Sequence, residues 1–205
     1  MTSRTFADDY AWQLTYQPAV REILTETFAA DDGDIQFTAR ESEDDRHFNT
    51  DIWVRVDGHI QRVSQRLRRY VVGDEFTLRY ARPGSRTEWQ KVWAGFGRFY
   101  VYGRGMPSGH LEDWFVGDLA VFKAWCMEYL DRGEDPPHIT KTNRDGSSEF
   151  VAFSRRDLPP EFTIAEDPNA EVREACWAVV KDSRGMDATG HASVVRWARA
   201  WLGLD

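Results

Sequence analysis

One acidic side chain and a run of arginines lie on the two arms of a predicted β-hairpin, residues 51–69. The centre of the hairpin is the dipeptide Asp57-Gly58. An Asp-Gly pair between two β-type runs is typical of a type I′ turn, in which the turn fixes the register of both strands. The predicted register therefore places Val56 opposite His59 and counts outward from that pair.

This register divides the hairpin into two faces, because successive side chains of a strand point in opposite directions. The apolar face carries Ile52, Val54, Val63 and Leu67. The polar face carries one carboxylate with a serine and arginines, namely Asp51, Arg62, Ser64, Arg66 and Arg68. Guanidinium groups bind phosphate oxygens in a bidentate manner. We expect the polar face to be the working surface, in cleavage or in binding alone.

Charge is distributed unevenly along the chain, whose net charge is −8. Residues 60–104 hold ten Lys and Arg against three Asp and Glu, a local balance of +7. A basic stripe on an acidic body is compatible with phosphate binding confined to one face, and a solvated strand surface is the alternative. The expected nucleic-acid contacts are Arg62, Arg68, Arg69, Arg79 and Lys91.

The remaining pattern predicts an α+β protein with a mixed sheet flanked by helices. Apolar spacing predicts a helix from Pro18 to about Phe28, a second one capped by Thr87, and a third over 119–130 that Asp118 opens. Strands are predicted over 35–40, 75–80, 98–102, 111–116, 139–141 and 150–153. We expect one α/β domain over 1–164, then a linker at 165–169 and a carboxyl-terminal helical hairpin within 165–205.

Several short motifs resemble the PD-(D/E)XK nuclease-like superfamily as it occurs in small phage and prophage proteins. They are Thr50-Asp51, Arg66-Leu67-Arg68-Arg69, Phe76-Thr77-Leu78-Arg79, Thr87-Glu88 with Lys91, Gly95-Phe96-Gly97, Tyr102-Gly103 and Asp118-Leu119. The resemblance runs from about Val20 to Pro160. It implies a restriction-endonuclease-like core, and for active members a magnesium ion that activates water against a phosphodiester of DNA.

The chain departs from the superfamily pattern at the strand opposite Asp51. Ser64-Gln65-Arg66 stands where active members carry Glu-x-Lys, so one carboxylate for a cation is lost. A second ligand would have to come from Asp44, Asp45 or Glu88. The resemblance then implies Asp51 and Asp45 as ligands of Mg²⁺, and Asp51, Ser64, Arg66 and Glu88 as the catalytic set. Arg66 would stabilise a phosphoryl transition state in place of the lysine.

Two alternatives to a nuclease remain open at this stage. A catalytically inactive derivative would bind DNA or a host protein through the same face, or would mimic DNA through the carboxylates of 31–45. A two-histidine phosphoesterase is the third hypothesis, because His138-Ile139-Thr140 and His191-Ala192-Ser193 place imidazole and hydroxyl two positions apart.

The sequence also bounds the environment of the protein. No apolar run approaches the ~20 residues that span a bilayer, and the first residues lack the pattern of a signal peptide. We therefore expect a cytoplasmic protein, in the host cell if it is encoded by a phage. Cys126 and Cys176 lack metal-ligand spacing and are expected to be buried, reduced thiols.

Overall fold

The computed structural model describes residues 6–39, 42, 50–69, 75–84, 86–143, 146–172, 175 and 176, and it has the expected α+β class. The helices are α1 (Phe6–Leu14), α2 (Gln17–Phe28), α4 (Glu88–Trp93) and α5 (Leu119–Asp131). The strands are β1 (Ile35–Phe37), β2 (Ile52–Val56), β3 (His59–Arg68), β4 (Glu75–Ala81), β5 (Phe99–Gly105), β6 (Leu111–Asp118), β7 (Ile139–Thr142), β8 (Glu149–Ser154) and β9 (Thr163–Glu166).

The predicted hairpin is confirmed, including its register. Strands β2 and β3 pair Val56 with His59 and Ile52 with Val63. Asp57 and Gly58 have φ values of 49° and 77°, the left-handed conformation that both central positions of a type I′ turn require. The predicted apolar face is buried as well, since Ile52, Val54, Val63 and Leu67 are all core residues.

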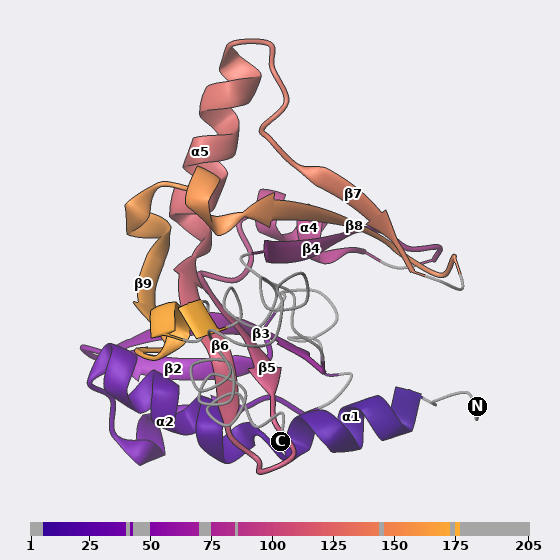
Figure 1. Cartoon of the computed structure of the whole chain (residues 1–205). Helices are drawn as coiled ribbons and strands as arrows, with labels where there is room; N and C mark the ends of the chain where they lie inside the picture. The colour runs from indigo at the N-terminus through magenta and orange to yellow at the C-terminus, as the bar shows by residue number, and fades with distance from the viewer. Residues whose placement is uncertain are drawn as a thin grey trace, which may run out of the picture. The chain divides into compact units, whose positions relative to one another are not determined.

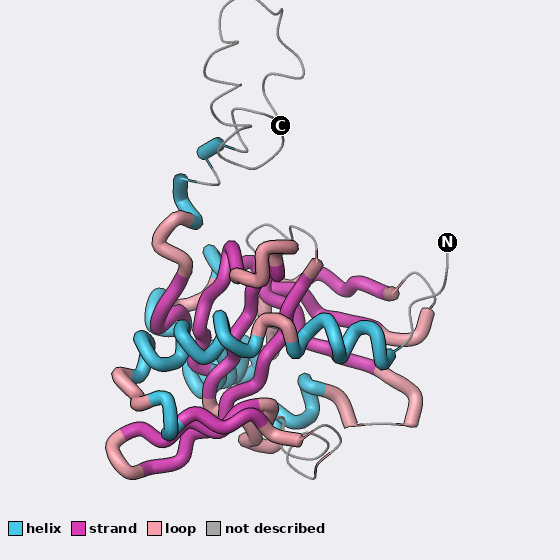
Figure 2. Tube along the Cα trace, turned by 90° about the horizontal axis from the view of Figure 1, so that it is seen from below, coloured by secondary structure: helices cyan, strands magenta, loops and turns pink. Residues whose placement is uncertain are grey.

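The hairpin lies within a six-stranded mixed sheet of order β1-β2-β3-β5-β6-β9. Strands β1, β2 and β3 are antiparallel, whereas β5 runs parallel to β3 and places Tyr100 beside Ser64 and Tyr102 beside Arg66. Figure 1 shows α1 and α2 on one side of this sheet, and Figure 2 shows them lying across its strands. The other side faces the remaining strands and helices.

A second sheet, of order β4-β8-β7, stands apart from the first. The predicted strand over 75–80 exists as β4, but its partner is β8, with Phe76 opposite Phe153. The strand that follows the hairpin in the sequence therefore leaves the hairpin's sheet, and the place beside β3 goes to β5. Figure 1 shows this second sheet with α4 and α5 above the six-stranded sheet.

Two hydrophobic cores fill the two sides of the six-stranded sheet. The first core joins α2 to the apolar face of the hairpin. The second core is aromatic and lies between the six-stranded sheet, the second sheet, α4 and α5. Phe76 of β4 is fully buried at its centre and contacts six rings, those of Tyr100, Tyr102, Phe115, Phe122, Phe153 and Phe162.

The two expected helix caps are present and fix where α4 and α5 begin. Thr87 caps α4 through a capping box with Gln90, in which each side chain bonds the backbone N–H of the other residue. Asp118 caps α5 by accepting from the N–H groups of Ala120 and Val121. Because α4 begins directly after Thr87, Glu88 is fixed at its first position.

The end of the chain differs from expectation at one point. Residues 163–166 form β9, an edge strand of the six-stranded sheet, so the predicted linker at 165–169 begins inside a strand. The chain divides into two compact units, 1–165 and 166–205. The predicted helices after residue 176 lie outside the described residues. No helix in the described part is both long and apolar enough to cross a membrane.

Gly117 of β6 gives a test of the aromatic core, because the Phe162 ring occupies the space of a missing side chain. A Cβ at Gly117 would lie 2.6 Å from the ring. We expect Gly117→Ala to destabilise the protein by about 1–3 kcal/mol through overpacking, as measured by urea unfolding. Gly33→Ala is the matched control, since nothing lies within 4 Å of that position. Equal stability of the two variants would contradict the packing described.

Candidate functional site

The centre of the site is an ion pair between Arg66 of β3 and Glu88 of α4. One guanidinium nitrogen, Nη1, donates to both carboxylate oxygens of Glu88, at 3.0 and 2.8 Å. The side chains are only 12% and 19% exposed. A charge-assisted pair in such a shielded place is stronger than a surface salt bridge. Two of the residues expected in the catalytic set are therefore in direct contact.

Arg79 of β4 completes a group of two guanidinium ions around one carboxylate. Its backbone N–H donates to Glu88 Oε2 at 3.0 Å. The ring of Phe150, on β8, lies beneath both arginines, with their Cζ atoms 4.5 Å (Arg66) and 5.8 Å (Arg79) from its centroid. We call Arg66, Arg79, Glu88 and Phe150 the arginine site. Two cations and one anion leave this site with a net positive charge.

Electrostatic effects within the arginine site favour the charged forms of Glu88 and Arg66. Burial acts to raise the pKa of Glu88, but the charges of Arg66 and Arg79 outweigh it and the pKa is lowered. Burial acts to lower the pKa of Arg66, but the carboxylate of Glu88, together with Tyr100 and Tyr102, outweighs it, so that pKa is raised. The pKa of Arg79 is lowered by burial, with a further contribution from the repulsion of Arg66.

Two donor atoms of the site are buried and make no hydrogen bond within the described part of the chain. They are the Nε–H groups of Arg66 and Arg79. Buried polar groups in proteins almost always have a partner, and a guanidinium N–H left without one is costly. The arginine site thus combines surplus positive charge with unused donors, which is the chemistry of an anion-binding site.

Asp51 and Ser64 lie on the hairpin next to this group. Asp51 Oδ2 accepts from the backbone N–H of Gln65 at 2.7 Å, so the carboxylate is held against β3 as the register predicts. Ser64 is 1% exposed. The polar face at this point is therefore covered rather than open, because the second sheet and α4 pack over it. Ser64 is therefore not open to solvent, and its predicted catalytic role stays a prediction.

Tyr100 lies close enough to the carboxylates of Glu88 and Asp51 to interact with both charges. Burial, together with the charges of Glu88 and Asp51, raises the pKa of Tyr100 well above its ordinary value. Its hydroxyl donates to the carbonyl of Thr77 in β4, and the Thr77 hydroxyl contacts the hydroxyl of Tyr102. These neutral groups join β5 of the six-stranded sheet to β4 of the second sheet, and they lie between Asp51 and the arginine site.

The other residues predicted to contact phosphate lie outside the arginine site. Lys91 is 8% exposed, so the expectation that it is an outer contact is wrong; it faces inward from the short helix α4. Arg69 pairs with Asp9 and lies 4.0 Å above the ring of Trp12, which ties the hairpin to α1. Arg62 lies over Trp53, the pair that the register predicts, at 4.9 Å. Arg68 is half-buried next to Arg104 of β5.

The described residues do not fit a resident magnesium ion. Within these residues no three His, Cys, Asp or Glu side chains are grouped as a metal site requires. Glu88 gives both oxygens to Arg66, and Asp51 Oδ2 is bound to Gln65, whereas Mg²⁺ needs carboxylates whose oxygens are available. The proposed ligand Asp45, with Asp44, lies outside the described residues.

The structure describes one of the two His-x-Thr/Ser triplets of the phosphoesterase hypothesis and part of the acidic stretch of the DNA-mimicry hypothesis. His138 precedes β7 and its Nδ1 lies 2.8 Å from the carbonyl of Pro136, while the second triplet, 191–193, lies outside the described residues. In the acidic stretch 31–45, Asp32 pairs with Arg21 and Asp34 with Arg55. The described carboxylates of that stretch are thus partly neutralised by arginines of the same protein.

Tyr100, Tyr102 and Phe150 were not predicted as site residues. Their position depends on the parallel pairing of β3 with β5 and on β8 reaching the arginines, and neither contact has a local signal in the sequence. Alternation in the strand over 98–102 does place Tyr100 and Tyr102 on one face, which is the only hint that the sequence offers.

Comparison of the chain with protein-family models, with curated proteins and with solved structures finds no match.

The ion pair predicts a specific dependence of stability on pH. The folded-state pKa of Glu88 is lowered, so the stabilisation is complete above the ordinary glutamate value of 4.5 and is lost as pH falls through the lower folded pKa. Glu88→Gln should cost about 3 kcal/mol at pH 7, because Arg66 loses its counter-charge.

Urea unfolding of the wild type and of Glu88→Gln at decreasing pH measures this effect. The difference in unfolding free energy between the two proteins should shrink in acid. Glu134→Gln is the control, since Glu134 pairs with Arg132 at the surface, and it should behave as the wild type does. A difference for Glu88→Gln that stays constant down to low pH would contradict the ion pair.

Proposed function

We propose that this protein binds the phosphodiester backbone of DNA at the arginine site. The observation that carries the proposal is the pair of guanidinium groups, of Arg66 and Arg79, that lie beside the single carboxylate of Glu88. A phosphate carries several acceptor oxygens and a negative charge. A phosphate that reaches the exposed part of the two guanidinium groups would relieve the repulsion between them.

The order of elements around the site also supports a nuclease-like protein. Helix α2, β1, β2 and β3 follow one another as in the PD-(D/E)XK resemblance, and Asp51 stands at the start of β2. The charges of Glu88 and Asp51 both raise the pKa of Tyr100, so both carboxylates lie near this ring and near the arginines. Fold-level likeness alone does not give an activity, and the proposal rests on the chemistry of the site.

The proposal assigns the site to binding rather than to metal-dependent hydrolysis. Arg66 takes the place of the lysine, and its fixed charge makes it a poor proton-transfer group. It also engages the carboxylate that would otherwise serve as second ligand. Arg66 and Arg79 bind the phosphate, Glu88 orients Arg66, and Asp51 holds the start of β2 against β3.

A DNA incubation separates binding from hydrolysis. Purified protein is mixed with single- and double-stranded DNA in Mg²⁺, in Mn²⁺ and in EDTA, beside Asp51→Asn, which keeps an acceptor for the Gln65 N–H. We expect retarded but intact DNA in every lane, by gel electrophoresis. Chelator-sensitive cleavage that disappears in the variant would contradict the binding proposal and establish a metal-dependent nuclease. Absence of retardation would contradict any role in nucleic-acid binding.

Arg79→Ala tests the role of the site in that binding. The substitution removes a guanidinium but leaves the backbone N–H that bonds Glu88. We expect about tenfold weaker DNA binding, and a slope of log affinity against log salt that is smaller by about 0.9, as for one lost phosphate contact.

The matched control is Arg132→Ala. Arg132 is an arginine at the end of α5 that pairs with Glu134, and it lies outside the arginine site. Equal losses for Arg79→Ala and Arg132→Ala, measured by fluorescence anisotropy over a range of salt concentrations, would contradict the assignment.

A further inference from the structure

A second cavity lies directly behind the arginine site. It has a volume of about 700 Å³, in the range of pockets that hold small ligands. Three separate segments each give one residue to the arginine site and the adjacent residue to this cavity. In β4 they are Arg79 and Tyr80, in α4 Glu88 and Trp89, and in β8 Phe150 and Glu149. The two places therefore share their walls.

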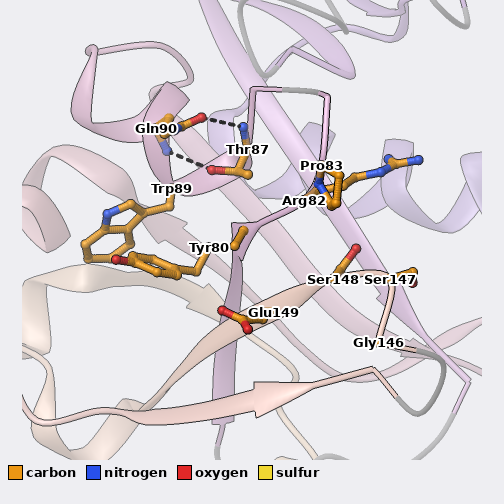
Figure 3. A pocket seen from close by; sticks show the side chains of 11 residues that line it. Tyr80, Arg82, Pro83, Thr87, Trp89, Gln90, Gly146, Ser147, Ser148 and Glu149 are labelled. Carbon is orange, nitrogen blue, oxygen red and sulfur yellow. Dashed lines mark hydrogen bonds between the residues drawn. The ribbon is translucent and has the colours of Figure 1, made fainter.

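The cavity has an aromatic end and a cationic end. Figure 3 shows the rings of Tyr80 and Trp89 at one end and Arg82 at the other, with Glu149 at the start of β8 and Ser148 just before it along one edge. The two rings have centroids 6.1 Å apart and planes inclined by 61°. They form a corner in which a planar group can stack on one ring and meet the other ring edge-on.

One of these rings is rigidly held and the other is exposed. Trp89 lies parallel to Phe153, with 10° between the planes, and is therefore anchored in the aromatic core. Tyr80 is 47% exposed, so part of its ring is accessible to a ligand. An anchored ring beside an exposed one is a stacking platform with an open side.

The polar groups of the cavity suit the edge of a heterocycle. Glu149 supplies acceptors. The capping box uses the side-chain oxygen of Gln90, which bonds the Thr87 N–H, so the amide nitrogen is the end that can donate to a ligand. Acceptors and donors beside a stacking surface are the means by which proteins read an unpaired base.

We propose that this cavity binds a nucleobase of single-stranded DNA, with the base against Tyr80 and Trp89 and the phosphate of the same nucleotide toward Arg82. This inference rests on the proposed function, because a phosphate further along the same strand occupies the arginine site. Successive side chains of a strand point to opposite faces of its sheet, so the DNA strand passes around β4, the edge strand of the second sheet, between the two contacts. A base within a duplex is stacked on its neighbours, so the occupant is an unpaired nucleotide.

The test uses two fluorescent oligonucleotides that differ only in their bases. One is an oligodeoxycytidine of about ten nucleotides, and the other is the same chain with abasic sites. The wild type should bind the base-bearing chain about 5- to 100-fold more tightly, the range expected for stacking of a base on an aromatic ring. Tyr80→Ala should lose this preference but bind the abasic chain as the wild type does. Tyr80→Phe should keep the preference.

Trp53→Ala is the control, because Trp53 lines a different and smaller cavity beside β2. Trp53→Ala should keep the preference for the base-bearing chain. If Trp53→Ala lost this preference and Tyr80→Ala kept it, the result would overturn the proposal in favour of Trp53. Equal binding of the two chains by the wild type would overturn the base pocket but leave the arginine site intact. Absence of binding to either chain would overturn both proposals. Binding of a neutral oligosaccharide that depends on Tyr80 would also overturn the proposal of a base pocket.

Discussion

The ion pair between Arg66 and Glu88 is the interaction on which the site depends. It joins the hairpin of the six-stranded sheet to α4, and the Arg79 N–H adds β4 of the second sheet to the same carboxylate. Desolvation makes a buried pair a weak source of net stability, whereas removal of one partner is costly. Its effect is therefore to hold three elements in one arrangement, with the two guanidinium groups beside each other over Phe150.

The two faces of the hairpin have separate tasks in this arrangement. One face packs on α2 and fixes the strand in the first core, and the other carries Asp51, Ser64 and Arg66 toward the aromatic core. Burial in the aromatic core is costly for a charged or polar side chain, so such a group is stable there only when it has a hydrogen-bonding or ionic partner. Two guanidinium groups beside the carboxylate of Glu88 are the basis for proposing an anion at the arginine site.

Local signals in the sequence were enough to predict the hairpin and the helix starts. Asp57-Gly58 fixes the register that holds Asp51 to β3, and Thr87 fixes Glu88 at the first turn of α4. Contacts between distant segments were not predictable in this way. The parallel pairing of β3 with β5, the departure of β4 to a second sheet and the burial of Lys91 all depend on tertiary packing. The sequence predicted Glu88 in the catalytic set and as one of three possible second ligands of a cation, and the structure places it at the site as the counter-ion of Arg66.

The central claim is that Arg66 and Arg79 hold a phosphate with their guanidinium groups, and NMR observation of the Nε–H of each group tests it most directly. A protein with ¹⁵N-labelled arginine is titrated with a short single-stranded oligonucleotide. The account predicts that the Nε–H resonances of Arg66 and Arg79 shift together and saturate with the binding curve, while that of Arg132 stays in place. Binding of the oligonucleotide without any shift of these two resonances would contradict it.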